Sequence, residues 1–184
     1  PTAEERARKG GNGIYYHVSY WGRPHDYLWL GTFSPYLLHQ QMKLAYDRGI
    51  QKMWVLNVGD IKPAEYQIEL FLDMAWNIDE VNEIGVTAHL KSWLGREFGS
   101  NCAEELLPAM EAHYQLSYIR KPEFMGNTRE EERDPKYKVI KDLPWSEQTI
   151  SERLRSYTVL SDVVERMESN IPADRQDAYF QLVK

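Results

Sequence analysis

The order of apolar and polar residues predicts two β-strands near the start of the chain. A β-branched and aromatic run is typical of a strand over residues 14–20. The run KMWVLNV, residues 52–58, is apolar almost throughout. Runs of this kind occur where a strand of a parallel sheet is buried on both faces, and we expect that burial here.

Each predicted strand is followed by a helix with an amphipathic pattern. Ser34 can cap the first helix, Pro35 suits its first position, and Gly49 lies just past its end. The second helix is expected over residues 64–76. This β-α-β-α order predicts parallel strands joined by a helical crossover. Two such units leave strand edges and faces uncovered, so they form only a fraction of a barrel or of a doubly wound sheet.

The rest of the chain is predominantly helical in pattern. Helices are expected over residues 87–98, 102–119, 148–169 and 173–183. Residues 121–146 lack a helical period and contain three prolines and the run REEER. A connection of that length is uncommon in a compact domain and is typically a functional or a mobile loop. The sequence therefore predicts an α/β fold followed by an all-α segment.

The composition of the 184-residue chain excludes several classes of protein. With 42% hydrophobic residues the chain can bury a core, and its length suits one domain or parts of two. The net charge of -6, without a cluster of Lys and Arg, argues against a nucleic-acid partner. No apolar run approaches the ~20 residues of a membrane helix, so we expect no membrane partner.

Two features bear on the origin of the chain. Cys102 is the single cysteine, which rules out a disulfide framework within the chain and leaves its compartment open. The sequence begins at Pro1 instead of Met, and we expect it to be a piece of a longer protein.

The stretch GIYYHVSYWGRPHDYLWL, residues 13–30, carries unusual chemistry for a strand and its turn. Its aromatic rings bear polar tips and alternate with cationic and acidic side chains. In parallel α/β folds, ligands bind at the carboxyl ends of the strands. The side chains expected at that edge are Tyr20, Trp21, Arg23, His25 and Asp26 after the first strand, and Asn57, Asp60 and Lys62 after the second. Aromatic faces stack on sugar rings, Arg pairs with carboxylates, and Asp can act as acid, base or nucleophile.

Each of these residues also has a purely structural explanation. Tyr15 and Tyr16 alternate across a strand, so one of them is expected in the core. His17 is typical of a hydrogen-bonded interior histidine, and Asp60 could simply cap the helix that follows. The acidic residues of the second helix fit a solvated stripe: Glu65, Glu69 and Asp73. No His, Asp and Glu cluster has metal-ligand spacing and no Gly-rich phosphate loop occurs, so we expect no metal and no organic cofactor.

Four segments carry a more specific signal when they are taken together. GIYYHVSYWGRPHDYLWL, QMKLAYDRG, WVLNVGDIKPAEYQIELFLDMAWN and YIRKPEFM follow one another along the chain. In this order they resemble glycoside hydrolase family 115, the xylan α-1,2-glucuronidases. The resemblance covers most of residues 13–124 and extends more weakly into the helical remainder.

The resemblance implies a fold, an activity and a partner. Enzymes of this family are long multidomain chains with a (β/α)8 catalytic barrel followed by a helical bundle. They remove glucuronic or 4-O-methylglucuronic acid side groups from xylan with inversion, and some barrel strands of such an enzyme would lie outside this chain. The resemblance thus predicts that residues 1–80 form the C-terminal part of the barrel. Residues 81–184 would form the bundle, with a long loop at 121–146. Xylan carrying glucuronic acid would be the partner, and the resemblance is also consistent with a periplasmic or secreted enzyme and a homodimer of the full-length protein.

The resemblance carries NVGD onto Asn57–Asp60 without fixing the role of each residue, so roles at the strand ends are predicted from their position. Inversion needs two carboxyl groups roughly 6.5–9.5 Å apart with room for a water. Asp60 is the predicted catalytic residue, because it follows a buried strand and precedes a helix N-terminus that would keep it ionised, as suits a general base. The second carboxylate is expected on strands outside this chain. The predicted substrate-binding residues are Tyr16, His17, Tyr20, Trp21, Arg23, His25, Asn57 and Lys62.

Two alternatives from other classes stay open. A non-catalytic glycan-binding or scaffold module would keep the aromatic groove and would bind a uronic-acid oligomer without releasing the sugar acid. A helical interaction domain would keep only the later helices, with residues 1–80 as a truncated remnant.

Overall fold

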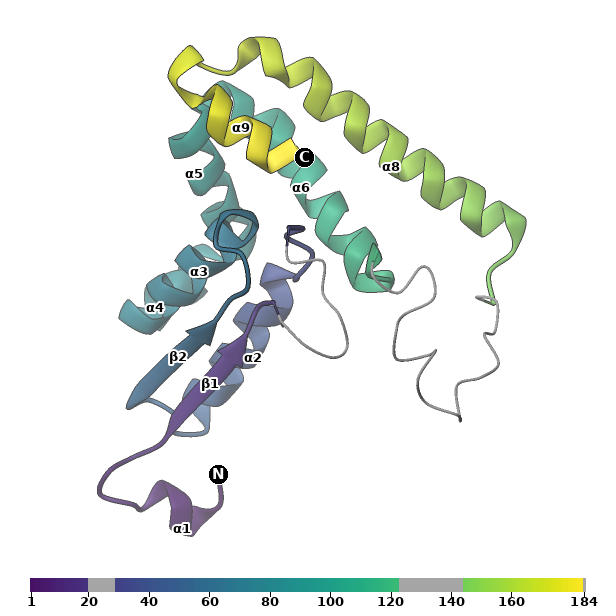
Figure 1. The fold of residues 1–184 in the computed structure, drawn as a ribbon. Coiled ribbons are helices and arrows are strands. Elements are labelled where there is room, and N and C mark those ends of the chain that lie inside the picture. Colours follow the sequence, from purple (N-terminus) through teal and green to yellow (C-terminus); the bar gives the residue numbers. More distant parts are fainter. Residues whose placement is uncertain (20–28, 123–143, 184) are drawn as a thin grey trace.

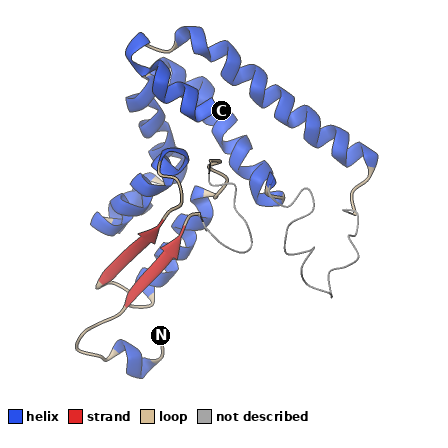
Figure 2. Ribbon diagram, in the orientation of Figure 1, coloured by secondary structure: helices blue, strands red, loops and turns tan. Residues whose placement is uncertain are grey.

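The computed structural model describes residues 1–19, 29–122 and 144–183. This part of the chain is mostly helical, with a small two-stranded parallel sheet (Figures 1 and 2). In chain order the elements are α1 (Ala3–Arg6), β1 (Gly13–His17), α2 (Pro35–Asp47), β2 (Met53–Asn57), the 3-10 turn η1 (Lys62–Ala64), α3 (Glu65–Trp76), α4 (Ile78–Ile84), α5 (Val86–Phe98), α6 (Ser100–Ile119), α8 (Glu147–Met167), the 3-10 turns η4 (Glu168–Asn170) and η5 (Ala173–Arg175), and α9 (Gln176–Val183).

The two strands pair in parallel, as the sequence predicts, although each is shorter than expected. The register runs from Gly13 opposite Met53 to His17 opposite Asn57, and α2 makes the crossover. The expectation that the second strand is buried on both faces is wrong for the described residues. No residue of β2 is buried, and Met53 is 64% exposed, because helices pack on one face of the sheet only.

The alternation of side chains along each strand separates a covered face from an open one. Tyr16 and Leu56 are partners in the register and pack against the core formed with the helices, as do Ile14 and Trp54. Tyr15, one residue away, is 58% exposed on the opposite face. In Figure 1, α2 lies behind the strands and the face turned to the viewer has no helix on it.

The helix ends follow the local sequence signals. The Ser34 hydroxyl accepts a hydrogen bond from the Leu37 N–H, and Pro35 begins α2. Gly49 follows that helix with φ of +85°, a backbone conformation that glycine adopts without strain. The predicted helix over 64–76 is present as η1 and α3.

The short helix α4 was not expected from the sequence. Its seven residues, IDEVNEI, carry three acidic groups and little apolar periodicity. The structure shows why it forms: the Asn77 side chain caps it by accepting from the Glu80 N–H, and Ile78 and Val81 are buried against the core.

One cluster of buried side chains joins the helices. Leu38, Leu70, Leu90, Leu94 and Leu106 are completely buried and come from α2, α3, α5 and α6. Met167 at the end of α8 and Tyr179 of α9 belong to the same cluster, although most of α8 is exposed along its length. Within the described ranges, none of the helices is long and apolar enough to span a membrane. The predicted domain boundary at residue 80 falls within α4 and stays a prediction.

Candidate functional site

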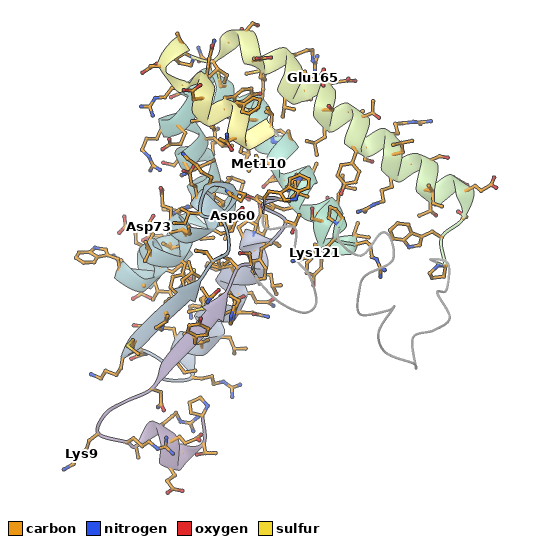
Figure 3. All side chains as sticks on the ribbon, in the orientation of Figure 1. Lys9, Asp60, Asp73, Met110, Lys121 and Glu165 are labelled. Carbon is orange, nitrogen blue, oxygen red and sulfur yellow. The ribbon has the colours of Figure 1, made fainter. Side chains whose placement is uncertain are left out.

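Two further hydrogen bonds join the carboxyl ends of the two strands, past the last pair of the β-ladder. The Val18 N–H donates to the Asn57 carbonyl at 3.2 Å, and the Gly59 N–H donates to the hydroxyl of Ser19. Asp60 comes next and is exposed just past the end of β2 (Figure 3). This edge therefore presents a carboxylate on a turn that both strands brace.

The hydrogen bonds around Asp60 show whether its carboxylate caps the following helix or stays available for catalysis. A helix cap would accept from backbone N–H groups of the next turn. However, η1 begins after Ile61 and α3 after Ala64, and neither helix has a side-chain cap. Among the described residues, none makes a hydrogen bond or an ion pair with the Asp60 carboxylate. The capping role is thus not observed, and the carboxylate is accessible to a substrate.

Lys62 lies two residues further on and already has an acidic partner. Its Nζ is 2.8 Å from Glu65 Oε1, and this interaction raises the pKa of the lysine. The ion pair is solvent-exposed and links neighbouring turns. Lys62 is therefore cationic, and a substrate carboxylate would have to compete with Glu65 for it.

Three polar side chains meet on the open face of the sheet. His17 and Asn57 are partners in the strand register, and the Asn57 amide donates to the Tyr15 hydroxyl. The Tyr15 and His17 rings lie edge to face with centroids 4.9 Å apart. The sequence predicted His17 and Asn57 as site residues but missed Tyr15. The signal was available, because Tyr15 and His17 are two apart and must share a face.

Tyr16 lies on the other face of the sheet. Its hydroxyl donates to Gln41 at 2.7 Å, and its ring contacts Phe33 edge to face and stacks on Phe71. Burial raises the pKa of Tyr16 to about 12. The structure thus places Tyr16 among the helices and not beside His17 and Asn57. Tyr20, Trp21, Arg23 and His25, together with Asp26, lie outside the described residues.

A cavity of about 320 Å³ lies between the strand-end loops and the helices. Lys62 and Pro63 line it on the side of the sheet, together with residues 29–31, and α3, α5, α6, α8 and α9 with Pro122 form the rest of the wall. Aliphatic and aromatic side chains make up most of that wall, with Tyr66, Trp93 and Tyr114 among the aromatic ones. Its size and largely apolar lining are typical of a small-molecule pocket, and its position connects the candidate site with the helices.

A possible cation site lies apart from this edge. The ligand atoms of Glu69, Asp73 and His89 all lie within 4.8 Å of one another, although the sequence suggested no metal cluster. His89 Nε2 lies 3.0 Å from Asp73 Oδ2, and Arg96 lies 2.6 Å from Glu69. His89 and the Arg96 guanidinium thus already pair with two of these carboxylates, and the positive charge of Arg96 opposes binding of a cation.

Comparisons with known proteins agree with the segments that the sequence highlights. The family model for Glycosyl hydrolase family 115 matches residues 1–124. A solved structure of a family GH115 4-O-methyl-α-glucuronidase, with specificity for decorated arabinogalactans, is similar over 100% of this chain, with 71% identity and a TM-score of 0.92. This chain spans 24% of the length of that protein, and a search of curated proteins gave no match. With more than half of its residues matched by the family model, the chain belongs to glycosyl hydrolase family 115.

Proposed function

We propose that this chain is a segment of an α-glucuronidase that removes glucuronic or 4-O-methylglucuronic acid side groups from a polysaccharide with inversion. The observation that carries the proposal is the 71% identity, over the whole chain, to a 4-O-methyl-α-glucuronidase of family 115. The Asp60 carboxylate, which is exposed at the carboxyl end of β2 and has no hydrogen-bond or ion-pair partner among the described residues, supports it independently.

The described α/β units suit the last part of a (β/α)8 barrel. In such a barrel the helices cover the outside, and the inner face of the strands carries side chains toward the centre. β1 and β2 have helices on one face only, and the other face carries Tyr15, His17 and Asn57. We propose residues 1–80 as this part of the barrel and residues 81–184 as a helical bundle, with the missing strands supplied by the rest of the enzyme.

The proposed chemistry uses one carboxylate of this chain. Asp60 acts as general base: it takes a proton from a water molecule while the water oxygen attacks the anomeric carbon of the uronic acid. A second carboxylic acid protonates the leaving glycosidic oxygen, and it would lie roughly 6.5–9.5 Å away on another part of the enzyme. His17, Asn57 and Lys62 would bind the sugar, together with Tyr20, Trp21, Arg23 and His25. Tyr16 would support the sheet from behind.

The polymer that carries the uronic acid is the least constrained part of the proposal. The sequence resemblance suggested xylan, whereas the similar solved structure is of an enzyme specific for decorated arabinogalactans. At 71% identity we favour a glucuronic-acid-bearing arabinogalactan. Release of the acid from glucuronidated arabinogalactan and from glucuronoxylan, measured side by side with the longer enzyme, decides between them. A homodimer of that enzyme stays a prediction.

The sharpest test of the proposed function is Asp60→Asn in the enzyme that contains this chain. Turnover should fall at least ~10²-fold, the lower end of a general-base contribution, while the melting temperature stays unchanged. Asp47→Asn is the matched control, because Asp47 is an exposed carboxylate at the far end of α2 that pairs with Lys43. Full activity of Asp60→Asn would remove Asp60 from the chemistry. A wild-type enzyme that binds the polysaccharide but releases no uronic acid would instead favour the glycan-binding alternative.

A further inference from the structure

Two side chains from the helices hold the segment that leads from the aromatic stretch into α2. His113 of α6 lies with its Nε2 2.9 Å from the Gly31 carbonyl. Because a carbonyl can only accept, this nitrogen must carry the proton and donate. Gln67 of α3 donates through its Nε2 to the Phe33 carbonyl at 3.1 Å. Gln67 is 1% exposed, and its Nε2 also lies 3.3 Å from the Tyr114 hydroxyl.

The same segment presses against the turn that follows β2. A Cβ added to Gly31 would lie 2.4 Å from the carbonyl oxygen of Pro63, closer than real Cβ contacts. Pro63 belongs to η1, which is closed by the Ala64 N–H donating to the Ile61 carbonyl at 3.0 Å. η1 begins two residues after Asp60, so the position of Gly31 is linked to that of the candidate base through a short and ordered turn.

We propose that Gly31, Gln67 and His113 are positioning residues for the hydrolysis. Together they form a clamp that fixes residues 29–34, the described end of the connection from β1 to α2, against the loop after β2 and so sets the position of Asp60. This inference rests on the proposed function for its catalytic consequence. It gives the helices a role in the reaction, since α3 and α6 supply the side chains that hold the loop. Burial lowers the pKa of His113, which keeps its ring neutral with Nδ1 free of a proton.

The clamp differs from an ordinary helix contact elsewhere in the chain. His39 of α2 donates from its Nε2 to the Asn82 side chain of α4 at 2.7 Å. This bond is of the same kind as the one made by His113, but it joins two helices and no strand-end loop. Loss of either bond should lower stability by a similar amount, whereas only the clamp should affect the chemistry. His39 is therefore a matched control.

The first experiment measures kcat and KM for uronic acid release by the longer enzyme. His113→Leu removes the donor and should lower kcat about 10- to 100-fold, the loss that a small misplacement of a catalytic group can cause. His113→Gln offers an amide donor at a similar reach and should restore kcat to within about threefold of wild type. His39→Leu should keep the wild-type kcat. A wild-type kcat for His113→Leu, or equal losses in His113→Leu and His39→Leu, would overturn the proposal.

The second experiment does not depend on activity. Thr32, Gly59 and Ala64 each donate a hydrogen bond from the backbone N–H in the two loops. In His113→Leu these amides should exchange with solvent at least ~10-fold faster than in wild type, and in His39→Leu they should not. Gly31→Ala should give the same pattern, because its Cβ displaces the Pro63 carbonyl. Unchanged exchange in both variants would disprove the clamp.

If the loops loosen as expected but the wild-type enzyme releases no uronic acid, the proposed function fails and the catalytic role of the clamp fails with it, leaving only a structural link.

Discussion

The sheet and the helices of this chain bury their side chains to very different extents. In β1 and β2 no residue is buried. In α3 and α5 the buried residues number eleven: Tyr66, Gln67, Leu70, Phe71, Met74, Val86, His89, Leu90, Trp93, Leu94 and Phe98. Among the described residues the strands are therefore the less covered part of the fold, while α3, α5 and α6 supply most of the buried core.

Under the proposed function, this difference indicates which part of the chain the rest of the enzyme would complete. Among the described residues no helix covers the open face of the sheet, and a two-stranded sheet with open edges and an uncovered face is marginal in water. The open face is also the one that carries Tyr15, His17 and Asn57. If the chain is a segment of an α-glucuronidase, as proposed, the part that holds the candidate chemistry is thus the part that the rest of the enzyme would surround.

The largest expected effect is a contrast in amide hydrogen exchange within the chain by itself. Amides of β1 and β2 should exchange at least ~10²-fold faster than those of α5 and α6, because the strands open locally without disturbing the core. In the longer enzyme this contrast should shrink. Equal protection of strands and helices in the isolated chain would show that the sheet is complete as it stands.

Two Leu→Ala substitutions, one in a helix and one in a strand, should show the same difference in burial at single side chains. Leu94→Ala removes a completely buried side chain of α5 and should lower the free energy of unfolding by about 2–5 kcal/mol. Leu56→Ala removes a half-buried side chain of β2 and should cost about 1 kcal/mol. Chemical denaturation of the three proteins gives both values. A larger loss for Leu56→Ala would mean that the sheet, and not the helices, anchors the fold.

Local signals in the sequence predicted much of this architecture. The cap at Ser34 and the glycine at position 49 bound α2 as expected, and the two apolar runs form parallel strands. These features depend on residues close together in the chain, which is why a single sequence can indicate them. The helix α4 was not predicted, for the opposite reason: its few buried residues matter only in the presence of the other helices.

The candidate site was harder to predict, for reasons of geometry. Alternation shows that Tyr15 and Tyr16 face opposite ways, but it does not show which face the helices cover. The hydrogen bond between His113 and Gly31 joins residues 82 apart in the sequence. A hydrophobic period along the chain does not predict a contact between such distant residues. Asp60 was found because its position at a strand end follows from local order alone, and its role stays a prediction.

The smallest expected effect is a change of stability with pH. It arises from His113, which links the helices to the segment before α2. His113 is enclosed where it borders the cavity, and burial lowers its pKa in the folded protein below the ordinary value, although the bond to Gly31 opposes part of this shift. The unfolded chain therefore binds a proton at His113 more readily than the folded chain does. The stability that the neutral ring contributes is complete above the ordinary histidine pKa of about 6.5 and is lost as the pH falls below it. The bond to Gly31 itself survives protonation, since Nε2 carries a proton in both forms.

Comparison of the wild type with His113→Gln isolates this contribution, because the other titrating groups are common to both proteins. The difference in melting temperature, wild type minus variant, should be constant above about pH 7 and should fall between about pH 6.5 and pH 5. Calorimetry at several pH values measures it, with His39→Gln as the matched variant for a histidine that makes its bond between α2 and α4. A constant difference down to pH 5 would mean that water reaches the His113 ring, and that the helices and the strand-end loops are less tightly joined than the bond to Gly31 implies.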